Sequence, residues 1–223
     1  MKDFAVPETF ERIEIESRGR PRYLDLPKRA FDLVLAVFLA PVIAPVIAVL
    51  WVLVRLDGGP GFFGHVRVGR GGRMFHCWKI RTMVPDAEAR LREHLLADPE
   101  AAAEWARDFK LARDPRITRI GGFLRKTSLD ELPQFWNVIR GDMSFVGPRP
   151  VISEEMERYG KHRDAYCAVR PGVTGLWQVS GRNDVSYAER VALDVRYLQT
   201  ASLLADLRII LQTAGAVLNR TGK

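Results

Sequence analysis

Cysteine is scarce in this chain, and its scarcity excludes two kinds of structure. Cys77 and Cys167 are the only cysteines among 223 residues and lie far apart, so they do not form the disulfide framework of a small secreted domain. A lone pair of cysteines is also a poor basis for a structural zinc site. We therefore expect both thiols to be reduced, as in a cytoplasmic compartment.

The chain also lacks the sequence patterns of nucleic-acid-binding proteins, although it is basic. Lysine and arginine total 34 against 27 acidic residues, which leaves a net charge of +7. It contains no RNP-type aromatic motif, no zinc-finger spacing and no compact lysine–arginine block, and its four histidines show no ligand spacing. Many arginines instead stand beside glycine or proline. This arrangement favours positioned contacts with phosphorylated substrates or lipid headgroups over nucleic acid.

Long apolar runs are absent except for one, which extends from Leu33 to Val54 without a charged side chain. A helix needs about 20 apolar residues to cross a bilayer core. The run begins too far into the chain, and is too long, for a signal peptide. A buried helix of a soluble domain is the alternative, but the run is apolar all round. The sequence therefore predicts a membrane segment.

The path of this segment is constrained by its flanks. Basic residues precede and follow it, so the positive-inside rule keeps both flanks on the cytoplasmic side. Pro41 and Pro45 lie near its middle, and proline kinks or breaks helices. A re-entrant helix that enters and leaves on one face satisfies both observations, although proline is also tolerated in spanning helices.

The remaining sequence predicts a mostly helical α+β protein. Residues 1–27 are polar and mixed in charge, and two alternating runs around glycines within Phe62–Arg81 predict a β-hairpin. Ser186 and Glu189 form a capping-box pattern that opens a helix through Tyr197. Further helices are expected over Asp86–Ala112, divided at Pro99, and over Leu129–Ile139, Ser153–Cys167 and Leu203–Leu218, the last with one broad apolar face.

Two adjacent acids, Asp130 and Glu131, are the first candidates for chemistry. They stand at a predicted helix start, where Ser128 and Glu131 also fit a capping box. Capping alone needs one acceptor, however, and many cations surround these two acids. An aspartate at a helix N-terminus is expected to have a lowered pKa and to remain ionised. Such an aspartate is able to attack phosphorus or to bind Mg²⁺.

Several cations are candidates for binding phosphate. Arg149 stands between Pro148 and Pro150, which fix its backbone for bidentate phosphate binding. Lys79 and Arg81 are two residues apart on a predicted strand and therefore share a face. Two interpretations are open: they bind a diphosphate, or they form the solvated side of the hairpin. A second turn-rich loop carries Trp177, Gln178 and Arg182, which are candidates for contacts with a nucleobase, a sugar and a phosphate.

These motifs together resemble the bacterial sugar transferase family, the monotopic phosphoglycosyl transferases. The resemblance covers the chain from about Pro27 to its C-terminus, and many motifs occur in order. They are Lys28–Asp32, Lys79–Met83, Asp114–Thr118, Leu124–Gln134, Val146–Pro150, Arg170–Gly175, Gln178–Arg182 and Leu193–Tyr197. The insert Ala87–Lys110 and the run Gly175–Tyr187 resemble the short members that start exopolysaccharides with galactose or glucose. The chain has Ala40 where members often have serine before the kink proline.

The resemblance implies a reaction. A hexose 1-phosphate passes from a UDP-hexose to undecaprenyl phosphate, UMP leaves, and glycan assembly begins. It implies Asp130 as the nucleophile that forms a phosphosugar intermediate and as a ligand of Mg²⁺, with Glu131 as its partner. Phosphates are expected at Lys79, Arg125 and Arg149, and by position also at Arg81 and Arg182.

The resemblance also implies an architecture and a location. Residues 1–27 are a tail, residues 28–56 a re-entrant membrane helix broken at Pro41, and residues 57–223 a cytoplasmic catalytic domain with amphipathic interfacial helices on the inner membrane. The expected partners are UDP-sugar, undecaprenyl phosphate and the membrane, with a homo-oligomer left open.

Two other readings of the sequence remain open. A ternary-complex transferase would use Asp130 only to bind Mg²⁺. A non-enzymatic membrane adaptor would bind acidic lipid through the basic surface.

Overall fold

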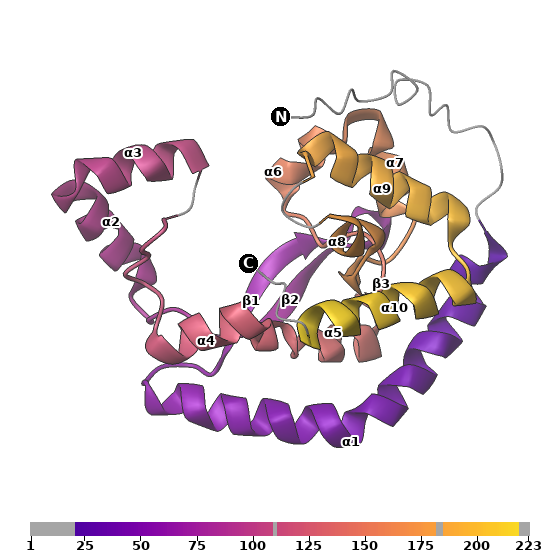
Figure 1. Ribbon diagram of the computed structural model, residues 1–223, viewed down its shortest axis with the longest axis horizontal. Coiled ribbons are helices and arrows are strands. Elements are labelled where there is room, and N and C mark those ends of the chain that lie inside the picture. The colour runs from indigo at the N-terminus through magenta and orange to yellow at the C-terminus, as the bar shows by residue number, and fades with distance from the viewer. Residues whose placement is uncertain (1–20, 109–110, 182–184, 219–223) are drawn as a thin grey trace.

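The computed structural model describes residues 21–108, 111–181 and 185–218. Within these ranges the chain is mostly helical with two small two-stranded sheets, which confirms the predicted α+β class. The N-terminal helix α1 (Leu26–Leu56) runs beneath α4 (Arg119–Thr127), α5 (Gln134–Arg140) and α10 (Leu203–Leu218), as Figure 1 shows. Asp130 and Glu131, the acids predicted from the sequence, lie in the segment between α4 and α5.

Helix α1 is long and apolar enough to cross a membrane, and most of its surface is uncovered. Its apolar window has a mean hydropathy of 2.9 and is only 11% buried inside the protein. Helical structure continues through Pro41 and Pro45, and the helix bends near its middle (Figure 1). Proline removes one backbone hydrogen bond and clashes with the preceding turn, which explains a bend. The predicted break at Pro41 is therefore a bend in a continuous helix, and the re-entrant path stays a prediction.

A buried ion pair fastens the start of α1 to α10. The Lys28 ammonium donates to the Asp206 carboxylate, and both side chains are almost fully buried. The hydroxyls of Tyr23 and Tyr197 also donate to Asp206, at 2.7 and 2.8 Å. A buried carboxylate is tolerated only when it is paired and hydrogen-bonded, and here one ammonium and two hydroxyls supply its partners.

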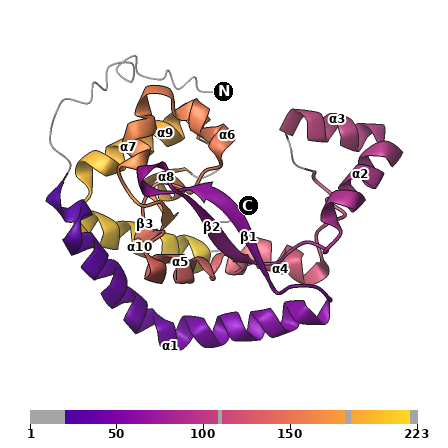
Figure 2. The same ribbon diagram turned by 180° about the vertical axis from the view of Figure 1, so that it is seen from behind.

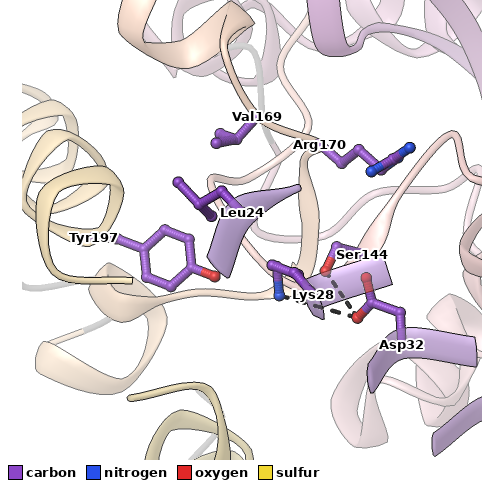
Figure 3. Close-up of a pocket in the computed structure, with 7 residues that line it drawn as sticks. All are labelled: Leu24, Lys28, Asp32, Ser144, Val169, Arg170 and Tyr197. Carbon is purple, nitrogen blue, oxygen red and sulfur yellow. Dashed lines mark hydrogen bonds and ion pairs between the residues drawn. The ribbon is translucent and has the colours of Figure 1, made fainter. Parts of the chain in front are cut away.

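A second buried acid on α1 joins it to the strand β3 (Ser144–Val146). Asp32 accepts hydrogen bonds from the Ser144 hydroxyl at 2.9 Å and from the Phe145 backbone N–H at 3.2 Å. Figure 3 shows these groups around a small cavity of about 10 Å³, with Lys28 and Tyr197 on one side and Arg170 on the other. This polar cluster holds the apolar helix against the rest of the fold.

The predicted hairpin is confirmed as β1 (Phe62–Val68) paired antiparallel with β2 (Met74–Ile80). Gly71 and Gly72 in its turn have φ values of 68° and 74°, which glycine adopts without steric cost. The buried Asn137 of α5 holds β2, because its amide oxygen accepts from the Trp78 N–H at 3.0 Å and its amide nitrogen donates to the His76 carbonyl at 2.8 Å. These two hydrogen bonds fix the position of β2 relative to α5.

A short parallel sheet, which the sequence did not predict, brings the two turn-rich loops together. Strand β3 pairs with β4 (Gly172–Thr174), and the Gly172 N–H donates to the Pro148 carbonyl at 2.7 Å. A Cβ atom on Gly172 would lie only 2.1 Å from the Gly147 nitrogen. Glycine is thus required at this crossing, and it places the Arg149 loop beside the loop of Arg170.

Other helices follow the predictions in part. α2 (Ala87–Ala97) and α3 (Pro99–Asp108) divide at Pro99 as predicted and stand apart from the body in both Figure 1 and Figure 2. α8 (Leu176–Ser180) precedes α9 (Tyr187–Thr200), whose capping box is confirmed by reciprocal bonds between Ser186 and Glu189. The helix predicted over Ser153–Cys167 is wrong as a single element: it consists of α6 (Ser153–Met156), a 3₁₀ segment (Glu157–His162) and α7 (Arg163–Cys167).

The helix predicted over Leu129–Ile139 is also divided. A 3₁₀ turn, Leu129–Glu131, precedes α5, and Ser128 before it has a left-handed φ of 56°. Leu129 and Leu132 pack against the cluster that contains Val54 of α1 and Ile80 of β2. The acids between these leucines are thereby held at the junction of α1, the hairpin and α5.

Candidate active site

The acid pair lies on this 3₁₀ turn and does not cap a helix through Ser128. The Ser128 side chain makes no capping hydrogen bond, so the predicted capping box with Glu131 is wrong. Asp130 is 8% exposed, whereas the Glu131 side chain is about one-third exposed. The two carboxylates are therefore available for other contacts and differ in their access to solvent.

Lys79 of β2 joins both acids. Its ammonium lies 2.7 Å from a Glu131 oxygen and 3.8 Å from a carboxylate oxygen of Asp130. The lysine of the strand and the two acids of the turn thus form one cluster of a cation and two carboxylates; all three residues are among the candidates named from the sequence. The cluster is partly open, since 30% of the Lys79 side chain is exposed.

Burial raises the pKa of Asp130, and the negative charge of Glu131 adds to this effect. The charges of Lys79 and Arg125 act in the opposite direction but do not outweigh it. The expected lowering of the Asp130 pKa by a helix N-terminus is therefore wrong, because burial dominates on this turn. Once ionised, a carboxylate with a raised pKa is the more basic and more nucleophilic one.

Arg125 and Arg81, both predicted to bind phosphate, have different surroundings. Arg125 is exposed at the end of α4, donates to the Thr82 hydroxyl at 2.9 Å and lies close enough to act on the pKa of Asp130. Arg81 is 6% exposed, and its guanidinium donates to the backbone carbonyls of Val54, Gly58, Pro60 and Met83. Arg81 therefore fastens the end of α1 to the hairpin, and its donors are occupied by the backbone.

Arg149 lines a cavity of about 40 Å³ together with Lys79 and Glu131. The Arg149 guanidinium lies 6.0 Å from the centre of the Trp177 ring of α8, within the range of a cation–π contact. The residues that complete the cavity are Arg67, Cys77, Gln134, Pro150, Val173 and Gln178. Four segments distant in sequence thus meet here: the hairpin, the 3₁₀ turn with α5, the Arg149 loop and α8.

The cavity brings together some of the predicted residues and adds others. Arg182 lies outside the described residues. Arg67 and Gln134 were not among the predicted site residues. For Arg67 a signal was available, because strand alternation from Lys79 and the pairing across a hairpin place it on the Lys79 face. For the buried Gln134 no signal was available, since its position depends on where α5 begins.

The sequence matches the bacterial sugar transferase family over residues 23–220. The chain belongs to the bacterial sugar transferase family. It is 52% identical over 195 residues to the undecaprenyl-phosphate galactose phosphotransferase of Salmonella typhimurium, covering 87% of this chain and 41% of that protein. It is 49% identical over 193 residues to the exopolysaccharide production protein ExoY of Rhizobium meliloti, covering 86% and 85%.

A third similar protein is the UDP-glucose:undecaprenyl-phosphate glucose-1-phosphate transferase of Caulobacter vibrioides. The identity is 39% over 204 residues, which cover 87% of this chain and 71% of that protein. The chain therefore spans less than half of the Salmonella protein but most of ExoY. The family match over residues 23–220 includes the whole candidate site described above.

Proposed function

We propose that this chain transfers a hexose 1-phosphate, with galactose or glucose as the hexose, from a UDP-hexose to undecaprenyl phosphate and releases UMP. The observation that carries this proposal is the buried Asp130 3.8 Å from Lys79, a lysine that lines a cavity together with Glu131 and Arg149. The printed names of the similar proteins support the lipid carrier and both sugars. The product would start an exopolysaccharide or another glycan.

The reaction proceeds in two displacements at one phosphorus atom. An Asp130 carboxylate oxygen attacks the β-phosphorus of the UDP-hexose, the phosphoanhydride bond breaks, and UMP leaves with the bonding electrons. An oxygen of undecaprenyl phosphate then attacks the same phosphorus, and the bond to Asp130 breaks. A covalent intermediate divides one difficult displacement into two easier ones, and the raised Asp130 pKa supports its role as nucleophile.

The surrounding charges support the positions of the phosphates. Lys79, Arg125 and Arg149 supply positive charge near the transferred phosphoryl group, which carries negative charge in the transition state. Glu131 holds the Lys79 ammonium at 2.7 Å, so it is a partner that orients this cation, and its exposed oxygen is available as a base or as support for a metal.

Magnesium is part of the proposal. The described residues contain no group of three metal-binding side chains, but Mg²⁺ is usually held by one or two carboxylates together with substrate phosphates. Asp130, with Glu131 adjacent, fits that donor set. When bound, Mg²⁺ would neutralise charge on the diphosphate. The residues that hold and orient the donor remain Lys79, Arg125 and Arg149.

We also propose that the enzyme is monotopic and sits in one leaflet of the inner membrane, with its catalytic domain on the cytoplasmic face. The uncovered apolar surface of α1 and the bend between its two halves support a re-entrant path. Exposed apolar side chains on the neighbouring helices support an interfacial seat: Phe123 of α4, Trp136 of α5, and Leu204 and Leu211 of α10. This seat would place the site between water and lipid headgroups.

The test is nucleotide release by the protein in nanodiscs with undecaprenyl phosphate, Mg²⁺ and a panel of UDP- and GDP-sugars. Release of UMP with one UDP-hexose, lost in Asp130→Asn, is the expected result. Exchange of labelled UMP into UDP-hexose without lipid phosphate would separate the covalent path from a ternary complex. Release of UDP would contradict phosphosugar transfer, and no release with any donor would favour a lipid-binding adaptor.

A further inference from the structure

Arg67 lies at the candidate site but has no part in the reaction as described so far. It is on β1, where it pairs with Phe75, and the same face of the hairpin carries the pair His65–Cys77 and, further along, Lys79. Arg67, Cys77 and Lys79 all line the 40 Å³ cavity. The alternation of the strands therefore directs two cations of the hairpin, Arg67 and Lys79, to the same space.

Within residues 21–108, 111–181 and 185–218, the guanidinium groups of Arg67 and Arg149 form no hydrogen bond and no ion pair; the Trp177 ring is the one partner found for Arg149. They are nevertheless near each other, since both line the same cavity. Burial and the charge of Arg149 lower the pKa of Arg67, while the charge of Glu155 acts in the opposite direction. Arg67 is half-buried and Arg149 is exposed, and neither guanidinium forms an ion pair with an acid of the described residues. Two guanidinium groups at one cavity repel each other, and an anion bound between them would offset this repulsion. The arrangement favours the binding of an anion between the two arginines.

The position of Arg67 along the hairpin indicates which anion it binds. Lys79 pairs with Phe63 at the end of the hairpin near α1, while Arg67 pairs with Phe75 near the turn. Four residues of strand separate Phe63 from Arg67, about 13 Å at 3.3 Å per residue. Figure 1 and Figure 2 show the hairpin running from the level of α1 and α4 towards α8. The cavity thus has a nucleophile end and an arginine end.

An in-line displacement requires the leaving group on the side of the phosphorus opposite the nucleophile. With Lys79, which lies 3.8 Å from Asp130, at one end of the cavity, the arginine end is where the departing phosphate would accumulate negative charge. A guanidinium binds a phosphate through two parallel hydrogen bonds, and two of them match the charge of a phosphate monoester.

We propose that Arg67, together with Arg149, binds the phosphate of the nucleoside monophosphate that leaves. This inference rests on the proposed function, because it assigns the leaving group of that reaction to a place in the cavity. It makes Arg67 a ligand of the donor's α-phosphate in the first step and of free UMP after it.

The test compares the binding of UMP and of uridine to the full chain in nanodiscs by calorimetry. Uridine lacks the phosphate, so its affinity should be the same in the wild type and in Arg67→Ala, while UMP binds about 10- to 100-fold more weakly to the variant. Arg67→Lys should retain part of the UMP affinity. Arg73→Ala, which removes an exposed arginine beside the hairpin turn, should bind both ligands as the wild type does.

Three results would overturn the proposal: unchanged UMP affinity in Arg67→Ala, equal losses of UMP and uridine affinity with a lower Tm, or a wild type that binds UMP no better than uridine. Turnover measured in parallel separates the two proposals. Normal UMP release by a variant with unchanged UMP affinity would refute the subsite and leave the reaction standing. UMP binding that depends on Arg67, without any transfer to undecaprenyl phosphate, would support the subsite and contradict the proposed reaction.

Discussion

Two clusters in this protein have the same composition, one lysine with two carboxylates, and opposite surroundings. Lys28 meets Asp206 and lies 4.0 Å from Asp32, and the three side chains are at most 6% exposed. Lys79 meets Glu131 at 2.7 Å and lies 3.8 Å from Asp130, with the lysine and the glutamate about one-third exposed. The lysine–carboxylate distances are similar and therefore do not distinguish the two clusters.

The two clusters differ in the other groups that lie near their carboxylate oxygens. Two tyrosine hydroxyls donate to Asp206, and a serine hydroxyl and a backbone N–H donate to Asp32. The Lys79 cluster instead borders a cavity lined by further cations. The Lys28 cluster is sealed from solvent and joins segments of the fold, although the second carboxylate oxygen of Asp32 has no hydrogen-bond partner among the described residues. The open Lys79 cluster borders a cavity, so its carboxylates are able to exchange partners with a substrate.

The largest expected effect separates activity from stability at Asp130. Asp130→Asn should lower UMP release by about 1,000-fold or more, since a carboxamide does not form the acyl phosphate. Its Tm should stay equal or rise, because the substitution removes a charge whose burial is unfavourable. Both are measured on one nanodisc preparation, and a large fall in Tm would mean that Asp130 also holds the fold together.

The sealed cluster should respond in the opposite way. Asp206→Asn leaves the buried Lys28 with a weaker partner, and breaking a buried pair costs about 3–5 kcal/mol. The expected Tm is lower by roughly 6–20 °C, whereas Asp164→Asn, at an exposed acid on α7, should be neutral. An unchanged Tm in Asp206→Asn would contradict the fastening of α1 by this cluster.

Removing the open lysine should change the pH dependence of the reaction. Lys79 lowers the pKa of Asp130 against the effect of burial, so Lys79→Met should raise that pKa further. Because the ionised carboxylate is the active form, UMP release increases with pH, and its acid limb should move to higher pH in the variant, with a rate about 10- to 100-fold lower. Lys126→Met, at an exposed lysine of α4, is the matched control. A pH profile of Lys79→Met identical to that of the wild type would mean that Lys79 does not influence the pKa of the nucleophile.

A further buried acid sharpens the comparison because it accepts from a hydroxyl and forms no ion pair among the described residues. Asp194 of α9 accepts from the Tyr159 hydroxyl at 2.8 Å, and burial raises its pKa to about 7 from 3.8. The folded state then binds a proton more tightly than the unfolded state between about pH 4 and 7. Stability therefore falls as pH rises through that window, by at most about 1.4 kcal/mol per pH unit. Asp194→Asn should flatten the dependence of Tm between pH 5 and 8, and an unchanged slope would assign it to another group.

Local sequence signals predicted the elements that depend on local interactions. The apolar run, the glycine turn of the hairpin, the division at Pro99 and the capping box at Ser186 were all readable, since each rests on residues a few positions apart. The motifs also identified the family, which the match over residues 23–220 confirms. The acid pair and Lys79 were named from these motifs, and the structure brings them together.

The features that the sequence did not predict depend on contacts between residues that are distant in the chain. Arg81 and Arg149 both belong to family motifs, but their side chains have different contacts. The Arg81 guanidinium donates to four backbone carbonyls, whereas Arg149 lines the cavity. The direction of the Asp130 pKa shift follows from burial by segments that are distant in sequence. The β3–β4 pair is too short to show periodicity, and Gly160, with φ of 47° and ψ of −124°, divides the helix predicted around it.

The pair between Lys28 and Asp206 has a consequence for the biosynthesis of the protein. Its members are 178 residues apart, and ribosomes add about 5–20 residues per second. Lys28 is therefore made roughly 10–35 s before its partner, and during this interval α10, which holds the start of α1, has not yet been translated. The pair with Asp206 therefore closes only after α10 has been synthesised.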